Sequence, residues 1–293
     1  MPNQPMTEPG VPRRVLGQCL RDLRQQAGFT VKAAARVMEW SEPKLWRVET
    51  GQTALRALDA QAMCTTYGAP PDLTRALTGL AGQTRAQGWW RTFGGAIPDD
   101  FSIYQVLEDA SCGLAVYAPG QMPGLLRTEA YARTILTSAG LSGEEADRLV
   151  HDCLARRALV TRTRAPLPMT VTLDEALVRR PVGGPEVMAG QLRFLTDAAV
   201  LPTVCLRVVP YGAGHHPGLV TGAFTMLHFP PAWDALDTGP AIVYAAGLTG
   251  ELYLDKPHEV QAYRDAHAAI LGCALDEHAS HALLLTVAKE LEQ

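Results

Sequence analysis

The stretch Thr30–Gly51, which reads TVKAAARVMEWSEPKLWRVETG, decides the fold of the N-terminal part of this chain. Its apolar residues recur at helical spacing in two short runs, Val31–Met38 and Ser41–Thr50. Thr30, directly before the first run, and Ser41, at the start of the second, are good N-cap residues. Gly51 is suited to end a helix. The stretch therefore predicts two short helices joined by a tight turn.

Further apolar stripes at helical spacing lie on both sides of this stretch. One helix is predicted to begin at Arg14 and to end at Gly28. Two more are predicted over 56–67, with Leu58, Ala62 and Met63 as the buried stripe, and over 72–85. Together these patterns predict a five-helix, all-α bundle over 14–85. Residues 1–13 contain several prolines, which disfavour regular structure, and are expected to form a flexible arm.

Charge is distributed unevenly along the 293 residues. Residues 1–91 contain 12 basic and 7 acidic residues, a net charge of +5, whereas residues 92–293 contain 14 and 23, a net charge of −9. A basic N-terminal part beside an acidic remainder is typical of a DNA-binding domain joined to a body that does not contact DNA.

A helix-turn-helix unit places its second helix in the major groove of DNA. Lys44 and Arg47 of that helix can donate hydrogen bonds to guanine or to phosphate. The alternative for each cation is an ordinary solvated helix face. The full set of expected DNA contacts, base-reading residues first and backbone contacts second, is Glu42, Lys44, Trp46 and Arg47, then Lys32, Arg36, Gln52 and Thr53.

Three segments in order, LGQCLRDLRQQAGFT, AAARVMEWS and KLWRVETGQ, resemble the helix-turn-helix of the XRE (Cro/CI-type) regulators. The resemblance implies an internal ion pair between Arg24 and Glu49, and either charge would be costly to bury alone. It also implies a positive φ in the turn, where Glu39 replaces a frequent Gly. The reading edge departs from the family pattern at Val31, Glu42, Pro43 and Trp46. These departures leave open a second interpretation, a protein-interaction module with weakened DNA binding.

Residues 86–293 predict an α+β domain with a small, largely antiparallel sheet. The predicted helices cover 100–117, a segment starting at Thr128, 142–164, 187–199, 258–271 and 277–291. The predicted strands cover 168–173, 204–209, 223–229, 241–245 and 251–254, with a hairpin turn at Leu248–Gly250.

The segments MPGLLRTEAYA, TLDEALVRR and VVPYGAGHHPG, with others in order, resemble the WhiJ-like, antitoxin-like domain that follows the helix-turn-helix in many actinobacterial regulators. The resemblance implies a sensing or partner-binding domain with no defined ligand, and we expect this domain to dimerise and to bind a small organic ligand or a small companion protein. It implies no defined reaction. The resulting expectation is a homodimeric transcription regulator that presents two recognition helices about 34 Å apart to double-stranded DNA.

Residues that carry chemistry are sparse in this sequence. His215 and His216 have no further ligand at metal spacing, so a polar loop is expected rather than a metal site. Asp174 and Glu175 at a helix start are expected to serve as caps. A possible ligand pocket, with boundary packing as its alternative, consists of Trp89, Trp90, Tyr104, Glu108, Tyr117 and Tyr131.

Catalysis and cofactor binding have little support in the sequence. It contains no P-loop, no G-x-G-x-x-G and no G-x-S-x-G motif, so no cofactor and no catalytic residue are expected. An enzyme acting on a secondary metabolite remains a minor alternative. The six cysteines form no C-x-x-C pair, and neither a signal peptide nor a membrane-spanning helix is expected. A cytoplasmic protein is expected.

Overall fold

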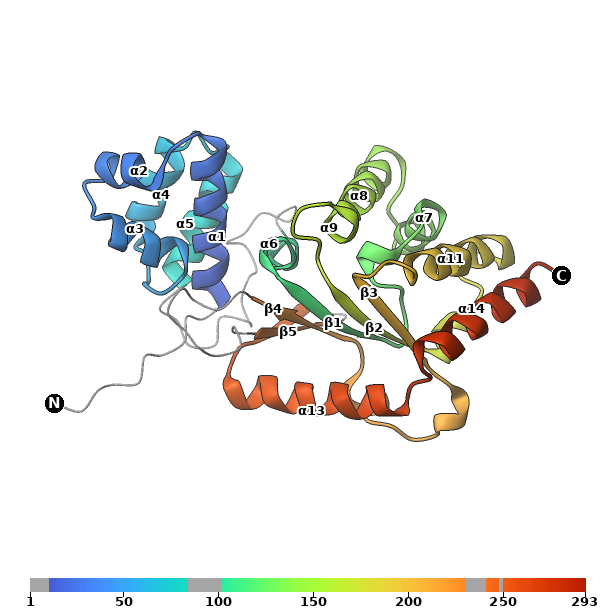
Figure 1. Cartoon of the computed structure of the whole chain (residues 1–293). Coiled ribbons are helices and arrows are strands. Elements are labelled where there is room, and N and C mark those ends of the chain that lie inside the picture. Colours follow the sequence, from blue (N-terminus) through green and yellow to red (C-terminus); the bar gives the residue numbers. More distant parts are fainter. Residues whose placement is uncertain (1–10, 84–101, 230–240, 248–249) are drawn as a thin grey trace. The chain divides into compact units, whose positions relative to one another are not determined.

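The computed structural model describes residues 11–83, 102–229, 241–247 and 250–293 (Figure 1). The described residues divide into two compact units. The first contains the chain up to Ala110, and the second contains 111–229 and 256–293, while residues between 241 and 255 are divided between the two. The predicted domain boundary at 85/86 lies outside the described residues and stays a prediction.

The first unit contains the predicted five-helix bundle, which is thereby confirmed. Its helices are α1 (Val11–Gln26), α2 (Val31–Val37), α3 (Glu42–Glu49), α4 (Ala57–Thr66) and α5 (Pro71–Gln83). The helix α6 (Ile103–Ala110) also belongs to this unit.

Two expectations for the bundle were wrong. Helix α1 begins at Val11, within the predicted arm, and Pro12 is tolerated there because a first-turn N–H has no intrahelical partner. In α4 the predicted stripe has the wrong phase, since Leu58 is 78% exposed. The buried residues of α4 are instead Ala60, Met63 and Cys64.

Helices α1 and α3 approach each other closely because Gly17 has no side chain. A Cβ atom at Gly17 would lie 2.5 Å from the carbonyl oxygen of Val48 and 2.7 Å from that of Glu49. Leu16 and Leu20 of α1 and Leu45 of α3 are almost completely buried. The bundle core therefore fixes the position of α3, the predicted recognition helix.

A six-stranded sheet has the order β3-β2-β1-β4-β5-β6, and its strands β1 to β4 lie in the second unit. The strands are β1 (Gly113–Ala118), β2 (Met169–Asp174), β3 (Val204–Val209), β4 (Phe224–His228), β5 (Ala241–Gly247) and β6 (Gly250–Leu254). The longer helices are α7 (Glu129–Ser138), α8 (Gly143–Ala155), α11 (Pro185–Ala198), α13 (Pro257–Cys273) and α14 (Glu277–Leu291). Shorter helices are α9 (Ala158–Thr161), α10 (Glu175–Arg179), α12 (Gly218–Thr221), η2 (Gly124–Leu126) and η3 (Tyr211–Ala213).

The α+β class is confirmed, and the sheet has six strands and is mixed rather than purely antiparallel. Strand β1 pairs with β2 in parallel, and β2 pairs with β3 in parallel, whereas β1 pairs with β4 antiparallel. Helices lie in sequence between β1 and β2 and between β2 and β3. Parallel neighbours need such crossover connections, so the sheet is mixed.

The helix expected over 100–117 was also wrong in its second half. It ends at Ala110, and 113–118 forms β1, the strand between β2 and β4. Five of the six residues of β1 are buried, so the segment is apolar on both sides. Such a run has no alternation that would separate a buried strand from a helix. The predicted turn at Leu248–Gly250 lies largely outside the described residues.

Helices cover both faces of the parallel part of the sheet (Figure 1). Helix α13 covers the face that carries Tyr117 and Phe224, because the ring of Phe224 lies 5.0 Å from that of Tyr263. Helices α7, α8 and α11 lie on the other face. Within the described residues, no helix is long and apolar enough to cross a membrane.

Candidate nucleic-acid interface

The turn between α2 and α3 is set by side-chain caps and by one unusual backbone angle. Thr30 Oγ1 accepts a hydrogen bond from the N–H of Ala33 at 3.1 Å, and Ser41 Oγ accepts one from the N–H of Lys44 at 3.3 Å. Glu39 has a φ of 54°, the positive value that the sequence predicted for this turn. A non-Gly residue in this region is strained by about 1–2 kcal/mol. The packed helices on both sides therefore hold the turn.

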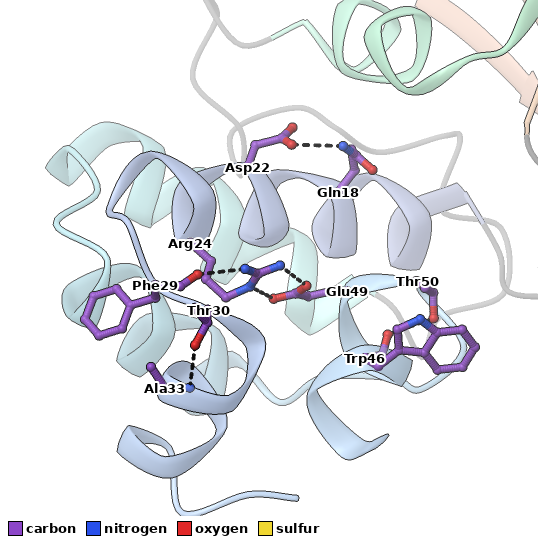
Figure 2. A network of polar contacts seen from close by, with 9 residues as sticks. All are labelled: Gln18, Asp22, Arg24, Phe29, Thr30, Ala33, Trp46, Glu49 and Thr50. Carbon is purple, nitrogen blue, oxygen red and sulfur yellow. Dashed lines mark hydrogen bonds and ion pairs between the residues drawn. The ribbon is translucent and has the colours of Figure 1, made fainter. Parts of the chain in front are cut away.

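The ion pair implied by the sequence joins α1 to α3 (Figure 2). Arg24 donates from Nε to Oε1 of Glu49 at 2.6 Å and from Nη2 to Oε2 at 2.9 Å. Its Nη1 donates to the carbonyl oxygen of Phe29 at 2.8 Å. The two side chains are only 7% and 5% exposed, and the hydrogen bonds to Glu49 raise the pKa of Arg24. This fork locks the C-terminal end of α3 onto α1.

Helix α3 separates its residues into a buried and an exposed face. Leu45, Val48 and Glu49 face the bundle. Glu42, Pro43, Trp46 and Arg47 are exposed, and Lys44 is half-buried. This division suits a recognition helix, because base-reading residues must stay accessible on a helix whose other face is packed.

Local contacts orient the two cations of α3. The ammonium of Lys44 lies 3.8 Å from the ring centroid of Trp40, within cation–π range. Arg47 donates from Nε to the carbonyl oxygen of Pro43 at 3.3 Å. This hydrogen bond does not use Nη1 or Nη2 of the guanidinium. Trp40 was not singled out from the sequence, since nothing in the spacing indicated that its ring lies beneath Lys44.

The expected backbone contacts lie around this helix. Lys32 and Arg36 are exposed on α2, while Gln52 is half-buried and Thr53 is exposed directly after α3. The N–H of Thr53 donates to the carbonyl oxygen of Arg47 at 3.2 Å, which holds the segment after α3 close to it. None of the four candidate cations, Lys32, Arg36, Lys44 and Arg47, belongs to an ion pair within the described residues.

The six residues of the possible ligand pocket have different surroundings. Trp89 and Trp90 lie outside the described residues, and Tyr104 and Glu108 lie on α6 in the first unit. In the second unit, Tyr117 lies beside Asp174, whereas the Tyr131 oxygen accepts a hydrogen bond from the N–H of Met122 at 3.3 Å. The convergence of the six residues stays a prediction.

One hollow among the described residues, of about 320 Å³, involves other residues. It lies where β1, β2 and β3 begin, and its lining includes Thr170, Cys205 and His228. It contains none of the six predicted pocket residues.

The adjacent acids and histidines of the second unit were only partly anticipated. Asp174 caps α10, since its Oδ1 accepts a hydrogen bond from the N–H of Ala176 at 2.8 Å, as expected. His215 is exposed, but His216 is only 4% exposed, so the expected polar loop was wrong for that residue. Within the described residues, no group of three or more His, Cys, Asp or Glu side chains could hold a metal ion.

Two family models match the chain, one in its N-terminal part and one in the remainder. Residues 15–77 match a family model described as a helix-turn-helix domain, and residues 101–286 match one described as a domain of unknown function, DUF5753. No curated protein and no solved structure matches the chain. The first match supports a DNA-binding regulator. The second match covers more than half of the chain, which therefore belongs to the DUF5753 family and carries a helix-turn-helix domain ahead of that domain.

Proposed function

We propose that the protein is a sequence-specific, DNA-binding transcription regulator of the XRE type, and that α3 is its recognition helix. The observation that carries the proposal is the exposed face of α3. That face presents Trp46 and Arg47, with Lys44 beside them, on a helix fixed from behind by the Arg24–Glu49 pair. Cations that lack an ion pair on a rigid helix are suited to contact DNA without first breaking internal bonds.

Each residue of this face has a distinct role in the proposal. Arg47 donates to guanine O6 and N7, for which a guanidinium has the matching geometry. Lys44, seated over Trp40, contacts phosphate or guanine. Trp46, which is 37% exposed, contacts a thymine methyl group or a sugar. Glu42 opposes the phosphates near the start of α3, so it lowers the affinity for every DNA sequence alike.

The second unit completes the proposed regulator. It would dimerise the chain and present two recognition helices about 34 Å apart, one turn of DNA. It would also bind a small molecule or a small companion protein that changes DNA affinity. The resemblance of its sequence to the WhiJ-like domains of actinobacterial regulators supports this part of the proposal.

Titration of a labelled duplex from upstream of the protein's own gene tests the proposal, read by fluorescence anisotropy at rising salt. Affinity should fall linearly on a log–log scale, by about 0.9 log units per log unit of salt for each phosphate contact. Arg47→Ala should weaken binding at least tenfold, which corresponds to about 1.4 kcal/mol or more and lies within the roughly 1–3 kcal/mol of a bidentate base contact.

Arg148→Ala is the matched control, because it removes one exposed arginine from α8 of the second unit. It should leave affinity unchanged. Binding that is absent at low salt, or equal losses in the two variants, would refute the recognition role of α3.

A second candidate function is an antitoxin-like module that binds a small partner protein. Three large apolar side chains of the helical bundle favour it, since Val37, Trp46 and Leu58 are 53%, 37% and 78% exposed. Exposed apolar surface is typical of protein interfaces more than of DNA interfaces. Native mass spectrometry of protein from its host would separate the two: a retained protein partner, lost in Leu58→Ser, supports the second function.

A further inference from the structure

Two buried polar side chains, Tyr117 and His216, meet the half-buried Asp174 at the carboxyl ends of β1 and β2. Asp174 ends β2, and its Oδ2 atom lies 3.5 Å from Tyr117 Oη and 3.6 Å from His216 Nε2. Tyr117 and His216 are 1% and 4% exposed. In open sheets with parallel strands, ligands bind beside the carboxyl ends of those strands. The cluster therefore lies at the edge of the sheet where a ligand is expected.

The hydrogen bonding of this cluster is incomplete. His216 Nδ1 and Thr172 Oγ1 are buried without a hydrogen-bond partner among the described residues. Thr172 is the cross-strand partner of Tyr117, so the two side chains lie on the same face of the sheet. Both contacts of Asp174 Oδ2 are longer than a good hydrogen bond of about 2.7–3.2 Å. Each buried unpaired polar atom costs about 1–3 kcal/mol. A ligand that forms better hydrogen bonds in this site than the His216 side chain does would therefore be favoured.

A glycine-rich segment, Pro210–Gly222, carries His216 and covers the cluster. Its backbone lies directly on the phenol, since a Cβ atom at Gly218 would lie 2.4 Å from Cζ of Tyr117. Gly214 and Gly222, on either side of His216, have φ values of 64° and 66°, which glycine adopts without strain. Three large apolar side chains of the segment are more than half exposed: Tyr211, Leu219 and Val220. A segment with so little buried apolar surface opens at low cost.

We propose that Pro210–Gly222 covers a binding site for a small planar nitrogen base, and that the His216 side chain occupies this site in the closed state. The imidazole lies edge-on to Tyr117, with ring centroids 6.1 Å apart and planes at 86°. The ligand takes this place, donates an N–H to Asp174 Oδ2 and reaches Thr172 Oγ1 with a second polar atom. The carboxylate of Asp174 favours a protonated base. The proposal names the ligand class for the sensing role proposed above and rests on that role.

The phenol of Tyr117 fits the same chemistry. Burial, and then the nearby Asp174 carboxylate, raise the pKa of Tyr117. The phenol therefore stays protonated at neutral pH and donates to the carboxylate or to the ligand. A site of this composition accepts N–H donors and discriminates against anions.

Imidazole is the probe for the test, used with full-length His216→Gly protein. This variant removes the occupant and leaves a space of imidazole size beside Asp174. Isothermal titration calorimetry should detect imidazole binding. Furan, a ring of the same size without an N–H, should bind at least tenfold more weakly. The matched control is Asp174→Asn in the His216→Gly background, which should also lose at least tenfold. Absent imidazole binding by folded His216→Gly protein, or equal binding by the double variant, overturns the proposal.

Hydrogen exchange of the unsubstituted protein provides a second test that needs no variant. Amides of 210–222 should exchange faster than those of β2, and excess imidazole should accelerate them at least severalfold by displacing His216. Exchange of this segment only together with β2 would overturn the proposal. Neither experiment reads DNA binding, so failure of the DNA titration and failure of the ligand site are distinguishable.

Discussion

Replacing Arg24 by Ala would remove the arginine from the ion pair that fixes α3 to α1. The Glu49 side chain, 5% exposed, would then be buried without its two hydrogen bonds from the guanidinium. Breaking a buried pair on one side costs about 3–5 kcal/mol, a large part of the roughly 5–15 kcal/mol that stabilises a domain. The carbonyl oxygen of Phe29 loses its bond from Nη1 as well. We therefore expect the helical bundle to become marginally stable or to unfold.

Amide hydrogen exchange of α1 and α3, read by mass spectrometry in the full chain, measures this loss for the bundle alone. A cost of about 3–5 kcal/mol corresponds to an increase in exchange rate of roughly two to nearly four powers of ten. The double variant Arg24→Met/Glu49→Leu should have exchange rates much closer to those of the unsubstituted protein, because it leaves no unpaired charge.

The exposed pair Arg56–Asp59 serves as a control for the loss of an arginine. Its side chains are 71% and 26% exposed, so Arg56→Ala should change stability by less than about 1 kcal/mol. The stabilising role of the Arg24–Glu49 pair is refuted if Arg24→Ala costs less than about 1 kcal/mol, or if the double variant costs as much as Arg24→Ala.

Three other predictions follow from buried groups. Burial lowers the pKa of His228 and of His267 below their usual 6.5, so the folded state binds fewer protons than the unfolded state. The free energy of unfolding, measured in urea, should therefore fall as pH drops below about 6.5, and this fall should be less steep in the His267→Gln variant. Burial raises the pKa of Cys64 to about 11, so iodoacetamide at pH 8 should modify exposed Cys112 far faster; equal rates by peptide mapping would contradict this. Gly17→Ala should destabilise the bundle by about 1–3 kcal/mol, because the added Cβ meets the backbone of α3. Gly82→Ala should stabilise α5 by up to about 1 kcal/mol, because nothing lies within 4 Å of the added Cβ. Melting temperatures that shift in the same direction for both variants would be inconsistent with the packing.

The features predicted well from the sequence are those set by neighbours along the chain. Thr30 and Ser41 cap helices because a short hydroxyl side chain reaches an N–H three residues later. Glu39 has its positive φ where the turn requires one. These rules act within a few residues, so the helix-turn-helix was predicted together with its exposed reading face.

The features that were missed depend on contacts between distant residues. The segment 113–118 becomes a strand because β2 and β4 pair with it on both sides, and its own apolar pattern fits a helix equally well. His216 is buried because its segment folds onto Asp174 and Tyr117, which lie far away in the sequence. Leu58 is exposed because α4 packs through Met63 and Cys64 instead. Local spacing contains none of this information.

The most direct measurement of the central claim is the anisotropy titration of upstream duplex DNA with unsubstituted protein, Arg47→Ala and Arg148→Ala. The proposed function predicts salt-dependent binding that Arg47→Ala weakens at least tenfold and Arg148→Ala leaves unchanged. Binding of the Arg47→Ala variant equal to that of the unsubstituted protein across the salt series would contradict the assignment of α3 as the recognition helix.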